Sequence, residues 1–217
     1  MIGAFIISLW SSLVEGIVQT SLLEWIAVLT GLGSVWYSVK ENIWVYPIGM
    51  ISVAIYMHLA FTYQLYADMG VNGYYFLMSI YGWYQWLQPE EKKPFKPITK
   101  NDGVYWIRSL LFFGISWITL YTILVSFTDS DVPFWDSLTT SFAIVGMWLM
   151  AEKKLEHWLF WIATDLVSIP LYFYKGLVLT SGQFLIFTLL AWLGWIRWNR
   201  EWTKLQQEGT PSRVPAK

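Results

Sequence analysis

The feature that most constrains the fold of this chain is a series of long apolar segments. Seven long stretches are predominantly apolar: 22–39, 43–66, 71–88, 104–127, 135–151, 155–174 and 178–199. A helix needs about 20 such residues to cross the hydrocarbon core of a bilayer. Hydrophobic residues make up 56% of the 217 residues, which is more apolar surface than a soluble domain of this length can bury. We therefore expect an all-α membrane protein with seven transmembrane helices.

The segment 1–20 is apolar too, but polar residues such as Glu15 and Gln19 interrupt it. No basic stretch precedes the apolar residues, so a cleaved signal peptide is not expected. We expect residues 1–20 to form a short interfacial helix that lies on the bundle.

The basic residues predict the orientation. With seven spans, the N-terminus and the loops near residues 68, 130 and 175 share one side, and of the 14 Lys and Arg residues only Lys175 lies there. Basic residues favour the cytoplasmic side of a membrane. The N-terminus is therefore expected outside, and the C-terminal tail 200–217 in the cytoplasm.

An internal repeat organises the spans. Sliding the sequence along itself until Trp36 meets Trp148 superposes spans one to three on spans five to seven without a gap, and this shift is here named the repeat offset. Nine identities result: Trp36 with Trp148, Leu59 with Leu171, Phe61 with Phe173, Leu65 with Leu177, Gly70 with Gly182, Leu77 with Leu189, Gly82 with Gly194, Trp83 with Trp195, and Trp86 with Trp198. Two three-helix bundles, 22–88 and 135–199, are thus predicted, joined by a cytoplasmic loop and linker helix over 89–127. The linker gives both bundles the same orientation, a 3+1+3 parallel repeat, and substrate sites in such proteins lie near the midplane between the halves.

Composition excludes several kinds of chemistry. The chain has no cysteine, two histidines and a formal net charge of −1. Disulfides, thiol catalysis and a cysteine-ligated metal are excluded, and neither a metal site, a cofactor nor a nucleic-acid partner is expected.

The candidate site is built around Asp165, an ionisable residue in the middle of the sixth span. Such residues are costly in a membrane and mark functional sites. Helical spacing places Trp161, Ser168 and Tyr172 on the same face, and stripes on the other helices are predicted to complete an aromatic cavity. The full set of predicted substrate-binding residues is Tyr56, Tyr63, Asn72, Tyr75, Ser79, Trp83, Trp161, Asp165, Ser168, Tyr172, Thr188 and Trp192. These groups suit a flat cationic ring that carries a polyol. The alternative is that Asp165 bonds a neighbouring Trp or Thr and only fixes helix packing.

Two long phrases carry a family resemblance. LAFTYQLYADMGVNGYYFLMSIYGWYQW (59–86) and DLVSIPLYFYKGLVLTSGQF (165–184) resemble the PnuC family of bacterial nicotinamide riboside transporters, and the resemblance covers residues 22–200. It implies a fold similar to the SWEET sugar transporters and a location in the bacterial inner membrane. It also implies uptake of nicotinamide riboside by facilitated diffusion, with alternating access, trapping by a cytoplasmic riboside kinase, and a homo-oligomer.

Other functions remain open from the residues alone. A uniporter for thiamine, riboflavin or a sugar would use the same fold. An intramembrane enzyme is the alternative from another class, but Asp165 has no acid or histidine in its stripe to act with it. Ion coupling is disfavoured because no second carboxylate lies at membrane depth.

Overall fold

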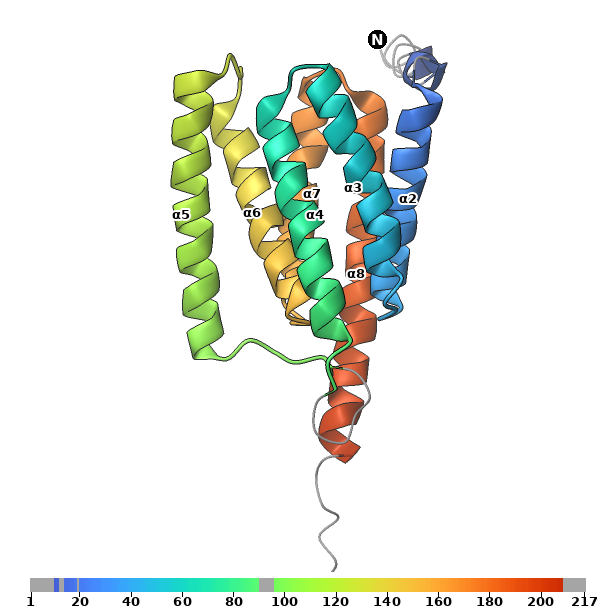
Figure 1. Cartoon of the computed structure of the whole chain (residues 1–217), viewed down its shortest axis with the longest axis vertical. Helices are drawn as coiled ribbons and strands as arrows, with labels where there is room; N and C mark the ends of the chain where they lie inside the picture. The colour runs from blue at the N-terminus through green and yellow to red at the C-terminus, as the bar shows by residue number, and fades with distance from the viewer. Residues whose placement is uncertain (1–9, 12–13, 19, 90–95, 209–217) are drawn as a thin grey trace, which may run out of the picture.

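The computed structural model describes residues 10–11, 14–18, 20–89 and 96–208. Within these ranges the chain is helical, with no strand and one isolated β-bridge between Thr99 and Lys154. The long helices are α2 (Leu22–Val39), α3 (Val45–Thr62), α4 (Tyr66–Trp86), α5 (Gly103–Phe127), α6 (Pro133–Ala151), α7 (His157–Tyr174) and α8 (Val178–Glu208). They run side by side along one axis, and α8 extends beyond the others (Figure 1).

Local sequence signals start several of these helices. Ser21 and Glu24 form a capping box at α2, with bonds of 2.7 and 3.2 Å. Asp102 caps α5 by accepting from the Tyr105 N–H at 2.8 Å. Pro133 occupies the first position of α6, where a helix needs no N–H donor.

Four turns between helices form two pairs, and the members of each pair are related by the repeat offset. Glu41 and Lys153 have φ of 57° and 58°, and Gln64 and Gly176 have φ of 59° and 77°. In each turn, the residue after the one with positive φ donates its N–H to the carbonyl five residues before it, at 2.8 or 2.9 Å. This bond ends the preceding helix. The turn at Gln64 corrects the expected span 43–66: α3 ends at Thr62, and Tyr66 begins α4.

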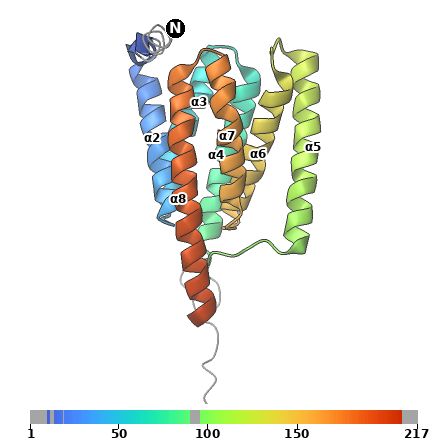
Figure 2. The same ribbon diagram turned by 180° about the vertical axis from the view of Figure 1, so that it is seen from behind.

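The helices pack in two groups. Helices α2, α3 and α4 pack on one another in chain order and are here named the first triple; α6, α7 and α8 do the same and are named the second triple. The triples meet where α4 packs on α6 and where α2 packs on α8. Among the described helices, α5 packs on α6 alone, at the edge of the bundle (Figures 1 and 2).

Close contacts inside each triple also recur at the repeat offset. Ser52 Oγ donates to the Ala27 carbonyl at 2.7 Å, and Thr164 Oγ1 approaches the Thr139 carbonyl at 3.5 Å. Glycines 82 and 194 let rings lie against the helix backbone, because a Cβ there would be 2.5 Å from Tyr46 or 2.4 Å from Trp158.

Four of the described helices, α2, α3, α5 and α8, are long and apolar enough to cross a membrane. Helices α4, α6 and α7 are not in this set. Helices α6 and α7 contain seven of the buried polar residues: Ser137, Thr139, Ser141, His157, Thr164, Asp165 and Ser168. By contrast, α5 exposes large apolar side chains such as Ile115 and Ile118, at 64% and 67%. An all-helical chain with apolar outer helices and polar groups turned inward is consistent with a membrane protein.

The structure describes only part of the predicted interfacial helix 1–20. Residues 10–11 and 14–18 are helical, whereas residues 1–9, 12–13 and 19 lie outside the described residues. Gly16 faces Leu179 at the start of α8, and Trp10 is 68% exposed. The interfacial position of this segment stays a prediction. Of the predicted tail 200–217, residues 200–208 continue α8, and 209–217 lie outside the described residues.

We predict that Gly194→Ala destabilises the fold, because the new methyl group would lie 2.4 Å from Cζ2 of Trp158. Overpacking of this kind costs about 1–3 kcal/mol. Gly182→Ala on the same helix is the matched control, since nothing lies within 4 Å of its Cβ. The melting temperature of detergent-solubilised protein should fall only for Gly194→Ala; equal melting temperatures would contradict the close contact.

Candidate functional site

Asp165 lies in the middle of α7 and is only 3% exposed. Among the described residues, no hydrogen-bond donor and no charged side chain pairs with its carboxylate. Ser168, one turn farther along the same face, is also buried, at 2% exposure. A buried carboxylate without a partner is unfavourable for the stability of the fold.

Two aromatic side chains from different triples meet one turn before Asp165. The ring of Tyr75 on α4 lies 6.4 Å from that of Trp161 on α7, centroid to centroid. Tyr74, which contacts the Tyr75 ring at 5.9 Å, donates through its hydroxyl to the Ile144 carbonyl of α6 at 2.9 Å. The structure therefore places Tyr75 against Trp161 at the contact between the triples, and Asp165 and Ser168 follow Trp161 along α7 as buried residues.

A second aromatic group lies farther along α7, toward the α7–α8 turn. Tyr172 stacks on Phe184 of α8, with centroids 5.0 Å apart and planes at 20°. The hydroxyl of Tyr56 on α3 interacts with the Gln183 side chain of α8. Tyr56 and Tyr172 are thus half-buried beside α8, rather than beside Asp165 itself.

Three predicted polar residues use their donors within their own helices. Asn72 Nδ2 donates to the Asp68 carbonyl, Ser79 Oγ to that of Tyr75, and Thr188 Oγ1 to that of Phe184, at 2.8 or 2.9 Å. Bonds to the preceding turn are common for short polar side chains in helices. Ser79 is buried, and the other two are half-buried.

The remaining three predicted residues are exposed: Trp83 at 37%, Trp192 at 58% and Tyr63 at 61%. The buried positions of α4 include Gly82 and Trp86, and those of α8 include Ala191 and Trp198. Adjacent helical residues differ by about 100° in direction, so Trp83 and Trp192 lie to the side of the buried face. Tyr63 caps the end of α3. Substrate contact by these three stays a prediction.

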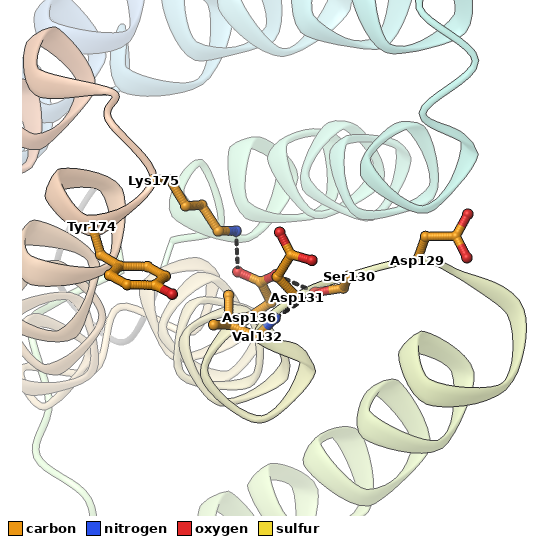
Figure 3. Close-up of a pocket in the computed structure, with 7 residues that line it drawn as sticks. All are labelled: Asp129, Ser130, Asp131, Val132, Asp136, Tyr174 and Lys175. Carbon is orange, nitrogen blue, oxygen red and sulfur yellow. Dashed lines mark hydrogen bonds and ion pairs between the residues drawn. The ribbon is translucent and has the colours of Figure 1, made fainter.

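The pocket that the structure describes lies at one end of the bundle, where α5, α6 and α7 end or begin. It has a volume of about 600 Å³ and is lined by Asp129, Ser130, Asp131, Val132, Asp136, Tyr174 and Lys175 (Figure 3). Lys175 Nζ lies 2.8 Å from Asp136 Oδ1, and Ser130 Oγ donates to Asp136 Oδ2 at 2.8 Å. Nine residues of helix, about 14 Å, separate Asp165 from Tyr174. The pocket is therefore distinct from the predicted midplane site.

The sequence predicts the side of the membrane on which Lys175 lies but not the pocket beside it. The signal that could have found it is the acidic run Asp129–Ser130–Asp131 before Pro133. Among the described residues, no group of three His, Asp or Glu side chains could hold a metal ion.

The sequence and the fold both match known transporters. The family described as nicotinamide mononucleotide transporter matches residues 21–200. The nicotinamide riboside transporter PnuC of Escherichia coli (strain K12) is 26% identical, covering 83% of this chain and 87% of its own. The riboflavin/roseoflavin transporter RibM of Streptomyces davaonensis is 24% identical, covering 85% and 89%. The crystal structure of the vitamin B3 transporter PnuC superposes with a TM-score of 0.68 at 22% identity, covering 92% of this chain and 90% of that one.

We predict that Asp165→Asn raises the melting temperature of the ligand-free protein. The substitution replaces an ionisable group that burial penalises by a neutral amide of nearly the same size. Asp136→Asn is the contrasting variant: it weakens the bond to Lys175 and should lower the melting temperature slightly. A large loss of stability in Asp165→Asn would instead mean that the carboxylate holds the helices together.

Proposed function

Because the chain belongs to the nicotinamide mononucleotide transporter family, we propose that it carries nicotinamide riboside across the bacterial inner membrane. The observation that carries this substrate is the buried, unpartnered carboxylate of Asp165, one helical turn after Trp161, whose ring contacts that of Tyr75. The relative from Escherichia coli, named for the same substrate, supports it.

The chemistry of the site fits the riboside. Its pyridinium ring is flat and positively charged, and its ribose carries hydroxyl groups. An aromatic face attracts such a cation by about 2 kcal/mol when water is excluded. The Asp165 carboxylate would balance the ring charge, and the buried Ser168 hydroxyl offers a hydrogen bond to the sugar or the amide.

The proposed architecture is the 3+1+3 parallel repeat of SWEET-like transporters, with seven spans. The turns, glycine contacts and serine or threonine bonds that recur at the repeat offset support it. So does the position of α5, which packs on α6 alone, as a linker between two equivalent units would. We place the N-terminus outside, so that the acidic pocket around Asp136 faces the incoming cation and attracts it electrostatically.

The proposed transport mechanism is facilitated diffusion by alternating access, made one-way by phosphorylation of the riboside by a cytoplasmic kinase. In the described residues Asp165 has no acidic neighbour with which to form a sodium site or a proton relay, which favours passive transport. The exposed apolar face of α5 offers a surface that lipid or a second copy of the chain would cover.

Riboflavin is the second candidate substrate, because RibM is related over most of both chains. Riboflavin is an uncharged aromatic ring system on a ribityl chain, so it would stack on Trp161 and Tyr75 but would gain little from the Asp165 carboxylate. A binding titration of the purified protein with nicotinamide riboside, nicotinamide, thiamine and riboflavin separates these candidates. The proposal expects the riboside to bind tightest.

We predict that Asp165→Asn weakens riboside binding and uptake at least tenfold, since it removes the charge that balances the ring. Tenfold corresponds to about 1.4 kcal/mol, a modest value for a desolvated charge pair. Glu201→Gln, which removes an exposed ion pair with Lys204 on the extension of α8, is the control and should change uptake less than threefold. Equal uptake by Asp165→Asn and the unsubstituted chain would exclude Asp165 from the site.

Proteoliposomes test the passive mechanism. We predict that riboside enters them without a sodium or proton gradient and stops at equal concentrations inside and outside. Accumulation above the outside concentration when a gradient is imposed would show ion coupling and contradict facilitated diffusion.

A further inference from the structure

Trp86 of α4 and Trp198 of α8 connect the two triples by hydrogen bonds at one end of the bundle. The Trp86 indole donates to the Met150 carbonyl of α6 at 3.0 Å, and the Trp198 indole donates to the Ser38 carbonyl of α2 at 2.9 Å. The two donors occupy equivalent positions of the repeat, and so do the two acceptors. The bonds therefore form a reciprocal pair: each triple donates one to the other.

An ion pair joins the same end. Lys153 Nζ lies 2.7 Å from Glu41 Oε1, and these two residues are also related by the repeat offset. Lys153 is 3% exposed, and its ammonium lies 4.7 Å from the centre of the Trp86 ring. Burial lowers the pKa of Lys153, and the carboxylate of Glu41 opposes that shift. The pair is thus buried on its Lys153 side, while the Glu41 side chain remains 30% exposed.

Side-chain hydrogen bonds between the triples concentrate at this end. Tyr46 also approaches the Met150 carbonyl at 3.5 Å, and Tyr81 and Gln85 both bond Glu152. In the described residues 22–89 and 96–199, two other side-chain hydrogen bonds join the triples away from this end. They link Tyr74 to the Ile144 carbonyl and Tyr56 to Gln183. At the opposite end, the ion pair of Lys175 with Asp136 lies within the second triple, beside an open pocket.

We propose that the reciprocal bonds of Trp86 and Trp198, with the Glu41–Lys153 pair, form the cytoplasmic gate of the transporter, and that this structure has that gate closed. The proposal rests on the proposed transport function and orientation. Since these hydrogen bonds and this ion pair lie at equivalent positions of the two triples, a rocking motion between the triples would break them together. Release of substrate to the cytoplasm requires that motion.

The segment before α5 supports one side of the gate. Ile98 is buried at 3% exposure, and Thr99 exchanges backbone bonds with Lys153 and Leu155 at 3.2 and 2.9 Å. Lys96 Nζ lies 2.9 Å from Glu152 Oε2. This segment therefore holds the α6–α7 turn that carries Lys153, and its contacts give the gate a fixed side against which the first triple moves.

The absence of cysteine from the chain allows a direct test with spin labels. One pair of labels on Lys40→Cys and Leu159→Cys, both exposed, reports the distance between the triples at the gate. A second pair, on the exposed Tyr66→Cys and Leu177→Cys, reports the opposite end. Pulsed electron paramagnetic resonance in lipid nanodiscs measures both distances in the otherwise unsubstituted chain and in the double variant Trp86→Phe/Trp198→Phe. This variant keeps an aromatic ring at each position but removes the indole N–H donor.

The double variant should gain at least a threefold larger population with a longer distance at the gate and a shorter distance at the opposite end. Trp44→Phe, which alters an exposed ring at the same end, should leave both distances unchanged. Unchanged distances in the double variant would overturn the gate, and longer distances at both ends would mean loosened packing and overturn it as well. If the double variant does not fold, Glu41→Gln should give the same opposite movements, and their absence would refute the proposal.

The distances need no substrate, so this test is separate from that of the proposed function. The unsubstituted chain could fail to take up nicotinamide riboside while the double variant shows the opposite movements. That result would support the proposed gate and contradict the proposed substrate.

Discussion

The cost of burying a carboxylate without a counter-charge is the constraint on which the functional account depends. Asp165 is 3% exposed, and nothing in the described residues compensates its charge. A protein can retain such a group only if a ligand, a proton or water completes it. The rings of Trp161 and Tyr75 favour a ligand among these three, because they provide a surface suited to a flat cation. Charge and ring faces together favour a pyridinium over an uncharged ring.

The two triples are similar at many equivalent positions, and they differ at charged residues of the candidate site. Turns, glycine contacts and tryptophan bonds recur at the repeat offset, so the two triples share one construction. At the position equivalent to Asp165, the first triple has Val53, and at that equivalent to Lys175 it has Tyr63. The charges of Asp165 and Lys175 thus have no equivalent in the first triple, whereas Asp136 has one in Glu24. In the proposed mechanism, this asymmetry would let two similar triples bind an asymmetric solute.

Much of the fold could be predicted from the sequence, because hydropathy and the repeat act over long stretches. The helix end at Thr62 could not, since the apolar run continues past Gln64 and only the positive φ of that residue reveals the turn. The predicted site residues do not all lie on one buried face. Asp165 and Ser168 are buried on one face of α7, but Trp83 and Trp192 lie beside the buried faces of α4 and α8. Helical spacing says which residues share a face; it does not say which face meets the partner helix, because packing decides that.

The measurement that tests the central claim most directly is a structure of the protein in lipid with nicotinamide riboside bound. The account predicts the pyridinium ring between the triples, within about 6 Å of the Trp161 or Tyr75 ring centre and with its charge toward the Asp165 carboxylate. A riboside bound only in the pocket beside Asp136, with Asp165 paired to a protein group, would contradict it.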